Sequence, residues 1–231
     1  MAEKIRVIHY INQFYAGMGG EDTASVGISV KEEPVGPGLL LKGLLGDNYE
    51  IAATIICGDN HIAENTEEVC GEFLEIVKKY NGQLFVAGPG FNAGRYGLGC
   101  GAATAAVTEK LKLPAVTGLY SENPGTDLYK DRAYILQTEN NAAKMRKAMK
   151  EIAAFAKRLA EGDFIGDGKK EGFHGSGPAI DIDYTMPASV RGVNMLLDKF
   201  YHRNFRTEVM MPNHEDIPLP VLDKPLSEIR L

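Results

Sequence analysis

Cysteine is scarce in this chain. Three cysteines stand among 231 residues, and no two of them form a C-x-x-C pair. An odd and widely spaced set argues against a disulfide framework and against a cysteine-rich zinc site, so we predict no metal. Free thiols persist in a reducing compartment, and we therefore expect a cytoplasmic protein.

Long hydrophobic runs are also missing. The most apolar windows, 39–45 and 114–119, are far shorter than the ~20 apolar residues of a transmembrane helix. The first apolar stretch is interrupted by Arg6, His9 and Asn12, which makes it too short and too polar for a signal peptide. We expect neither export nor a membrane span.

Charges of one sign do not gather in a long block that could attract a polyanion. The chain has 25 Lys and Arg against 31 Asp and Glu, a net charge of −6, so binding to nucleic acid or to an anionic membrane is not predicted. A content of 44% hydrophobic and 24% charged residues is typical of a globular protein, and the length suffices for one large domain.

Short apolar runs that end in turn residues alternate with helical patterns. The sequence predicts buried strands at 5–11, 51–57, 83–87, 115–119 and 134–137. The clearest helix, 140–159, repeats apolar residues at spacings of four and three, and Asn140 is predicted to cap its start. Asn65 and Glu68 predict a capping box at the start of another helix.

Strands that are separated by helices must mostly be parallel. The predicted fold class is therefore α/β: a three-layer, doubly wound, mostly parallel sheet of about five strands, Rossmann- or flavodoxin-like. We predict an α/β domain over 1–203, with an irregular glycine-rich excursion at 162–186. A proline-rich linker at 204–231 is expected to lead to an absent second domain.

Polar or glycine-rich loops follow four of the predicted strands. Doubly wound sheets bind ligands outside the carboxyl ends of their strands, so these loops are expected to share one edge. The first loop carries the polar side chains and glycines Asn12, Gln13, Gly17, Gly19, Gly20 and Glu21. Glycines let backbone N–H groups approach an anion, so an anion-binding loop is predicted; a glycine-rich turn without a ligand is the alternative.

Two more loops supply candidate pocket residues. Asp59 follows the second strand, where Cys57 is either a reactive thiol or, more simply, a small buried hydrophobe. Glu122 and Asn123 follow the fourth strand and precede a Pro-Gly turn. Turn chemistry alone is the alternative explanation for these two residues.

The loop after the third strand is the richest. The string GPGFNA at 88–93 matches the dinucleotide fingerprint G-x-G-x-x-A. Pro89 removes one N–H, and no acidic residue ends a strand about 20 residues further on, which weakens a nicotinamide or flavin site. We favour an anion site in which the backbone of Gly88 and Gly90, the helix start at Asn92, and Arg95 bind a carboxylate or phosphate.

Several strings together resemble one family: HYINQFYAGMGGED, IICGDN, AGPGFNAGRYGLGCG, TGLYSENPGTDLY and the MRKAM helix. They look like the N-terminal half of the selenoprotein subunit of component B of glycine, sarcosine or betaine reductase, related to the D-proline reductase selenoprotein. The resemblance covers nearly the whole chain. It implies a part in a complex of amino-acid-fermenting anaerobes that reductively cleaves the C–N bond of the substrate, leading to acetyl phosphate.

The resemblance also implies partners and roles. In that family a pyruvoyl group of a second component B subunit holds the amine, a selenocysteine attacks the α-carbon, and the component A selenoprotein accepts the carboxymethyl group. A hetero-oligomer with these partners and a small amine substrate is therefore implied. Arg95 and Asn92 would bind the substrate carboxylate, and the pocket and the contact with the pyruvoyl subunit would be shaped by Asn12, Gln13, Glu21, Asp59, Glu122 and Asn123.

One departure from the family limits what this chain is expected to do. The family's selenocysteine belongs to the C-terminal half, and none of Cys57, Cys70 and Cys100 matches its position. We therefore expect no catalytic residue and no cofactor in this chain, and no turnover by the isolated chain. It is either a fragment or a stand-alone homologue with a separate redox subunit. Two rival hypotheses stay open: a nicotinamide-dependent oxidoreductase that uses the Gly88–Gly90 turn, and a non-catalytic scaffold subunit.

Overall fold

The structure is a computed structural model that describes residues 4–175, 177 and 188–203. The chain divides into two compact units, Met1–Asp181 and Ile182–Leu231. The first unit contains the sheet, and the described part of the second is the helix α8 (Ala188–Phe200) and the residues up to Arg203. The predicted linker at 204–231 and part of the predicted excursion at 162–186 lie outside the described residues, so both stay predictions.

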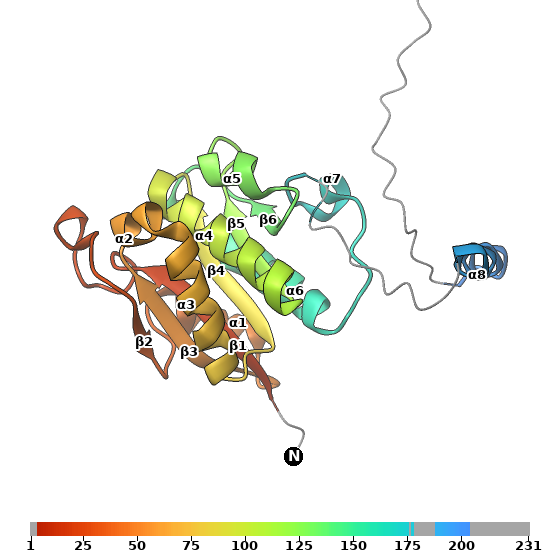
Figure 1. Ribbon diagram of the computed structural model, residues 1–231, viewed down its shortest axis with the longest axis horizontal. Coiled ribbons are helices and arrows are strands. Elements are labelled where there is room, and N and C mark those ends of the chain that lie inside the picture. The colour runs from red at the N-terminus through yellow and green to blue at the C-terminus, as the bar shows by residue number, and fades with distance from the viewer. Residues whose placement is uncertain (1–3, 176, 178–187, 204–231) are drawn as a thin grey trace, which may run out of the picture. The chain divides into compact units, whose positions relative to one another are not determined.

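A six-stranded sheet forms the centre of the first unit, with its strands in the order β2-β3-β1-β4-β5-β6 (Figure 1). Five strands run parallel: β1 (Ile5–Asn12), β3 (Tyr49–Cys57), β4 (Leu84–Phe91), β5 (Ala115–Leu119) and β6 (Tyr134–Gln137). All five predicted strands are confirmed, although β4 continues well beyond its predicted end at Ala87.

The sixth strand, β2 (Ser29–Lys31), is antiparallel to β3 and was not predicted. It places Ser29 opposite Ile56 and Lys31 opposite Thr54. Its three residues, two half-buried and one exposed, carry too short a pattern to stand out in a sequence, because strands are recognised by alternation over four or more positions. The expected sheet of about five strands therefore gains one short edge strand.

The direction of winding reverses between β1 and β4. From β1 the chain passes through α1 (Pro37–Leu45) to β3 on one side, whereas β4, β5 and β6 follow one another on the other side. The five parallel strands thus have the flavodoxin-like order, which confirms the doubly wound α/β class. Folds of this kind bind ligands where the winding reverses, at the carboxyl ends of the two central strands.

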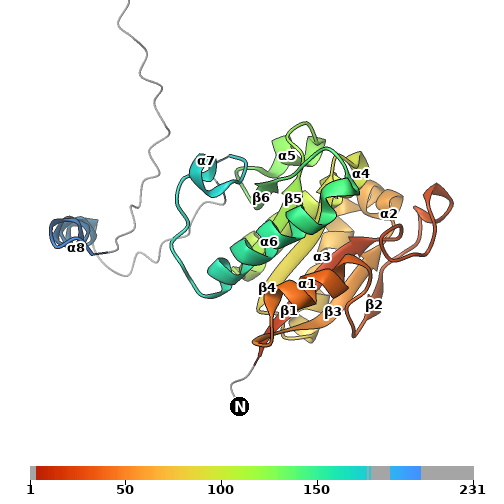
Figure 2. The same cartoon turned by 180° about the vertical axis from the view of Figure 1, so that it is seen from behind.

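Helices cover both faces of the sheet and give three layers. The helices α1 and α6 (Met145–Ala160) lie side by side on one face (Figure 2), and α3 (Thr66–Lys79) and α4 (Gly94–Ala106) cover the other. The shorter elements are α2 (Asp59–Glu64), α5 (Pro124–Tyr129), α7 (Gly168–Glu171), the 3-10 turns η1 (Glu21–Thr23) and η3 (Ala142–Lys144), and the π-helical end of α4, η2 (Val107–Leu111).

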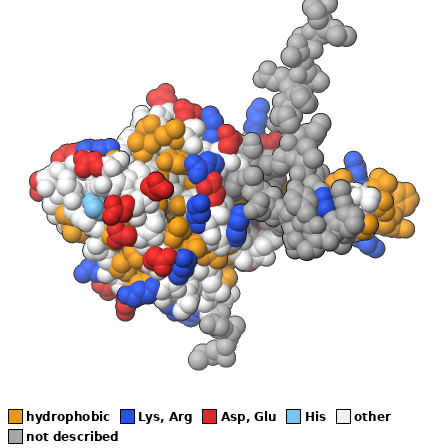
Figure 3. Space-filling view, viewed as in Figure 1, with side chains coloured by type: hydrophobic (Ala, Val, Ile, Leu, Met, Phe, Trp, Pro, Cys, Tyr) orange, Lys and Arg blue, Asp and Glu red, His pale blue; other side chains and the backbone are white. Residues whose placement is uncertain are grey.

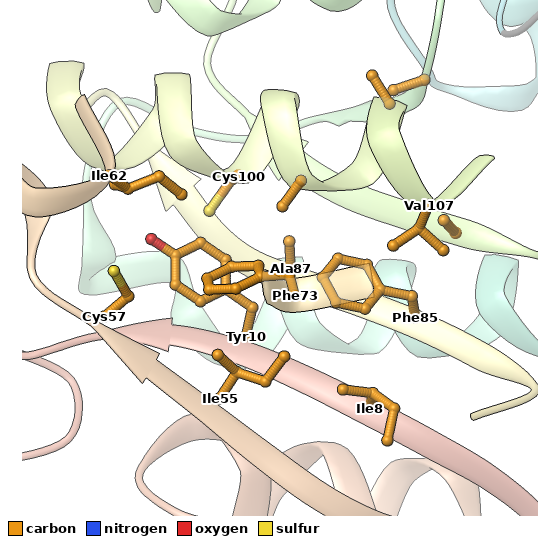
Figure 4. Packing of buried hydrophobic residues seen from close by; sticks show 14 of the residues in the cluster. Ile8, Tyr10, Ile55, Cys57, Ile62, Phe73, Phe85, Ala87, Cys100 and Val107 are labelled. Atoms are coloured by element: carbon orange, nitrogen blue, oxygen red, sulfur yellow. The ribbon is translucent and has the colours of Figure 1, made fainter. Parts of the chain in front are cut away.

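Each face of the sheet has its own apolar core. Under α3 and α4, Tyr10 and Phe73 pack edge to face with their ring centroids 4.9 Å apart, and Cys57 and Cys100 lie among the same apolar side chains (Figure 4). On the opposite face Met149 and Ile152 of α6 are fully buried against the sheet. The two cores fix the strands between rigid layers, which holds the loops at the carboxyl edge in place.

The two predicted helix caps are wrong. Asn65 does not accept a hydrogen bond from the start of α3; its side-chain amide donates to His61 O at 3.1 Å, and its backbone N–H donates to the same carbonyl at 3.2 Å. Because α2 ends directly before α3, both donors of Asn65 bind the last turn of α2. Asn140 does not cap α6 either. A 3-10 turn precedes the helix, and Asn141 caps that turn by accepting a bond from Ala143 N at 3.0 Å.

Candidate functional site

The loops that follow β1 and β3 meet at the carboxyl edge of the sheet. Asn12 and Gln13 are both buried, and their side-chain amides donate to Asp59 Oδ2 at 3.0 and 3.4 Å. The backbone N–H of Asp59 donates in turn to Gln13 Oε1 at 3.1 Å. Residues separated by more than forty positions thus form one network, as the predicted fold requires.

A second segment, 20–26, closes over the same loop. Gly58 N donates to Val26 O at 2.9 Å, and Asn60 N donates to Ala24 O at 2.8 Å. A Cβ at position 58 would lie 2.3 Å from Ala24 O, so only glycine permits this approach of the two backbones. Segment 20–26 is therefore held against the start of α2 by backbone hydrogen bonds.

Arg95 lies in the first turn of α4 and reaches this network from the β4 side. Its guanidinium donates to Oε1 of Glu21 and to Oδ1 of Asn60. Glu21 is 77% exposed and Arg95 44% exposed, and an ion pair so open to water contributes less than about 1 kcal/mol. The guanidinium therefore holds a carboxylate that another carboxylate could replace.

Asn60 is the site residue that the sequence analysis missed. It stands directly after Asp59 at a strand end, and it orients Arg95 while its amide donates to Ser25 Oγ at 3.2 Å. The signal that could have found it is its place in the string CGDN, in which only Asp59 was selected.

Asp59 has an unusual environment for a carboxyl group. Burial raises its pKa, and the amide hydrogen bonds of Asn12 and Gln13 together with the charge of Arg95 act against that increase. Its Oδ2 accepts those two bonds, whereas its buried Oδ1 has no hydrogen-bond partner among the described residues. We call one group of residues the crevice, after the place at the carboxyl edge where doubly wound sheets bind ligands: Asn12, Gln13, Glu21, Asp59, Asn60 and Arg95. This group contains charges of both signs at the reversal point of the fold.

The glycines of the first loop shape a self-contained turn. Gly17 and Gly19 have φ values of +71° and +142°, which favour glycine over other residues. Gly20 N donates to Asp22 Oδ1 at 3.0 Å, and Gly20 O accepts a bond from Thr23 Oγ1 at 3.1 Å. The backbone N–H of Gly20 is therefore already bonded, and the anion-binding role of these three glycines stays a prediction.

The structure corrects the predicted turn at 88–93. Gly88 and Gly90 lie buried inside β4, which continues to Phe91, and α4 begins only at Gly94. A register irregularity between Ala87 and Phe91 accommodates Pro89, which has no N–H to donate to a neighbouring strand. A Cβ on Gly90 would lie 2.7 Å from the Leu119 side chain, so this glycine serves close packing. This geometry does not match the dinucleotide fingerprint, whose glycines form an open turn.

The remaining candidates lie on the β4–β5 side. The Asn123 side chain is fully buried and donates to Phe91 O at 3.0 Å and to Ala93 O at 3.2 Å, which fixes the turn before Arg95. Asn92 donates to Asn140 Oδ1 at 3.1 Å and does not join the crevice, and Glu122 is exposed. Their roles in binding stay predictions.

The three cysteines do not resemble activated nucleophiles. Each is buried, and burial raises the pKa of Cys57 to about 12, that of Cys70 to about 11 and that of Cys100 well above its usual value. A thiol with a raised pKa is almost entirely protonated at neutral pH. Within the described residues, no three His, Cys, Asp or Glu side chains are grouped closely enough to hold a metal ion.

Comparison with known proteins identifies the family. The model of the family described as glycine/sarcosine/betaine reductase selenoprotein B matches residues 4–230. The chain belongs to this family. The sarcosine reductase complex component B subunit beta of Peptoclostridium acidaminophilum is 40% identical over 99% of this chain and 52% of its own length. The glycine reductase complex component B subunit gamma of Carboxydothermus hydrogenoformans is 42% identical over 97% of this chain and 52% of its own.

A third relative, the betaine reductase complex component B subunit beta of P. acidaminophilum, is 35% identical over 96% of this chain. The names of these selenoprotein B relatives assign them to multi-component complexes that act on three different substrates. This chain spans about half the length of the curated relatives it matches. None of the solved structures matches it, and its described helices include none with the length and apolar character to cross a bilayer.

Proposed function

We propose that this selenoprotein B family chain is part of an amino-acid reductase complex that cleaves the C–N bond of glycine, sarcosine or betaine. The observation that carries this proposal is the family match over residues 4–230, with relatives of all three substrate names. The part that we assign to this chain is to bind the substrate in the crevice, beside a pyruvoyl-containing component B subunit and within reach of component A.

The carboxylate that all three substrates share is the group that Arg95 would bind. A guanidinium presents several N–H donors in a plane that matches a carboxylate, and such charge-assisted hydrogen bonds are about twice as strong as neutral ones. Glu21 already occupies the guanidinium in the way that a bound carboxylate would. Asp59 adds a negative charge to the crevice, which suits the cationic nitrogen of the same substrates.

The bond-breaking chemistry belongs to groups outside this chain in our proposal. A selenocysteine would supply the nucleophile and a pyruvoyl group on the partner would hold the amine. The three buried, protonated thiols support this division of labour, since none of them is a suitable nucleophile at neutral pH. The isolated chain is expected to bind substrate without converting it.

The proposal is tested by comparing glycine with glycinamide, which keeps the amine and lacks the carboxylate. Glycine should bind the chain, and Arg95→Ala should weaken that binding about tenfold or more, the loss of a charged hydrogen-bond pair. Glu21→Gln should strengthen it a few fold, because the competing carboxylate is removed. Titration followed by NMR, with sarcosine and betaine as further ligands, gives these affinities.

The matched ligand control decides the assignment. Equal binding of glycine and glycinamide, or an unchanged affinity in Arg95→Ala, would show that Arg95 does not bind the carboxylate. In the complete reductase complex, Arg95→Ala should raise KM for the amine substrate. Loss of complex assembly with unchanged substrate affinity would favour a scaffold role instead.

A further inference from the structure

A groove lies outside the crevice, along α6. Its volume is 610 Å³, and its walls come from α6, the end of β6, η3 and the short helix α7. Leu136, Ala148 and Phe155 are buried and form an apolar floor. None of the functions proposed above uses this groove.

The rim of the groove is cationic. Four basic side chains line it, Lys144, Lys147, Arg158 and Lys170, against three acidic ones, Glu139, Glu151 and Glu171. Lys147 pairs with Glu139 at 3.1 Å, and Arg158 binds Glu171 through two contacts of 2.5 and 3.1 Å. Among the described residues Lys144 and Lys170 have no ion-pair partner, so two exposed cations are left for a ligand.

The basic character of α6 contrasts with the rest of the chain. Residues 144–158 contain six Lys or Arg and one Glu, a charge of +5. Since the whole chain has a net charge of −6, all its other residues together carry −11. Residues 59–75 on α2 and α3, by contrast, contain six Asp or Glu and no Lys or Arg. Figure 3 shows acidic side chains gathered over α2 and α3, on the face of the sheet that α6 does not cover.

The length of the groove selects the kind of ligand. Its lining residues on α6 run from Lys147 to Arg158, a span of eleven positions or about 16 Å along the helix axis. A small anion cannot contact both ends of such a groove. An extended polypeptide of five or six residues covers the same length at about 3.3 Å per residue. Its alternating side chains can place apolar groups on the floor and carboxylates at the rim.

We propose that this groove, on the α6 face, is a docking site for an acidic segment of a partner protein in extended conformation. Charge complementarity carries the assignment: unpaired Lys144 and Lys170 flank an apolar floor in a chain that is otherwise strongly negative. The inference does not depend on substrate binding in the crevice. Opposite charges of this kind speed the encounter of two proteins and suppress wrong partners.

The test uses a fluorescent peptide of alternating Glu and Leu as the probe and the full chain as the receptor. The double variant Lys144→Glu/Lys170→Glu reverses the two unpaired cations of the groove. The double variant Arg146→Glu/Lys150→Glu makes the same change in net charge at exposed positions of α6 that do not line the groove. Both pairs are exposed, so both variants should fold, which circular dichroism checks.

Reversal in the groove should weaken peptide binding about tenfold, whereas the control pair should change it less than about twofold. Binding should also weaken when the salt is raised to about 0.3 M, since screening shortens the reach of the charges. Equal losses in both double variants would overturn the proposal in favour of unspecific attraction. Equally tight binding of free glutamate would make the groove a small-anion site and also overturn it.

A second copy of this chain is the remaining occupant, since its own α2 and α3 are acidic. Sedimentation of the protein alone at low salt measures self-association. A monomer, together with the groove-dependent loss of peptide binding, supports a partner protein. A dimer that Lys144→Glu/Lys170→Glu dissociates would overturn the proposal, because the groove would then bind the chain itself.

Discussion

At the scale of single residues, the buried histidine of β1 makes the stability of the fold depend on pH. His9 is fully buried, and its Nε2 lies 3.0 Å from Gly88 O on β4. A carbonyl only accepts hydrogen bonds, so Nε2 is protonated and donates to Gly88 O. The other ring nitrogen, Nδ1, has no hydrogen-bond partner among the described residues. Burial lowers the pKa of His9 to about 4, and the bond to Gly88 acts against this shift. The ring is therefore neutral at physiological pH.

This pKa predicts a loss of stability in acid. The unfolded chain, with a histidine pKa of 6.5, binds more protons than the folded chain between pH 6.5 and about 4. The free energy of unfolding should therefore fall as pH falls through this window, and His9 contributes up to about 3 kcal/mol of the loss. Glutamine does not titrate in this range, and its amide can still donate to Gly88 O. The free energy of unfolding of His9→Gln, measured with urea, should therefore fall less than that of the unsubstituted chain between about pH 7 and about pH 4.5.

His174 also has a lowered pKa because of burial, but it is present in both proteins and does not affect their difference. An equal loss of stability in His9→Gln and in the unsubstituted chain would contradict the assignment to His9.

At the scale of elements, α4 departs from ordinary helix composition. A glycine inside a helix costs about 1 kcal/mol relative to alanine, yet α4 contains several. At Gly97 an added Cβ would lie 2.1 Å from the Asn123 amide, and at Gly101 it would lie 2.6 Å from the Tyr129 ring. The glycines let α4 pack closely against α5, and this contact fixes the turn that carries Arg95.

The same glycine-to-alanine change should therefore have opposite effects in two helices. Gly97→Ala should destabilise the protein by about 1 to 3 kcal/mol, because Asn123 is displaced from the bonds that it makes to Phe91 and Ala93. Gly71→Ala in α3 has no atom within 4 Å of the added Cβ and should stabilise the protein by about 0.5 to 1 kcal/mol. Thermal unfolding of both variants checks the signs. Stabilisation by both substitutions would mean that helix propensity outweighs the contact between α4 and Asn123.

At the scale of the whole molecule, both apolar cores are formed within the first unit. Their buried residues run from Val7 to Phe173, and the sheet that separates them ends at Gln137. A chain that contains both cores contains the packing that drives its folding. The first unit therefore has what an independent domain requires.

A fragment of residues 1–181 should accordingly unfold in one cooperative transition, with a Tm within a few degrees of that of the full chain. Circular dichroism during heating measures both transitions, and the full chain is the control. A fragment that shows no transition would mean that residues beyond Asp181 are needed for folding.

The sequence alone determined the five parallel strands, the α/β class and the edge at which polar loops meet. Buried parallel strands are short apolar runs that end in turn residues, and this signal lies within a few adjacent positions. It also indicated Asn12, Gln13, Glu21, Asp59 and Arg95 as neighbours at that edge, because topology places the ends of parallel strands together. The resemblance to the selenoprotein B family, which the family match confirms, rested on the same loop strings.

Tertiary structure alone decided which of these groups touch. Arg95 pairs with Glu21 across 74 positions and with Asn60 across 35, and Asn123 is bonded inside the protein at the turn before α4. It also decided that Gly88 and Gly90 continue a strand, that β2 forms, and that α6 has a cationic groove beside it. These outcomes depend on atoms that are distant in the chain and meet only after folding, so no local pattern of residues contains them.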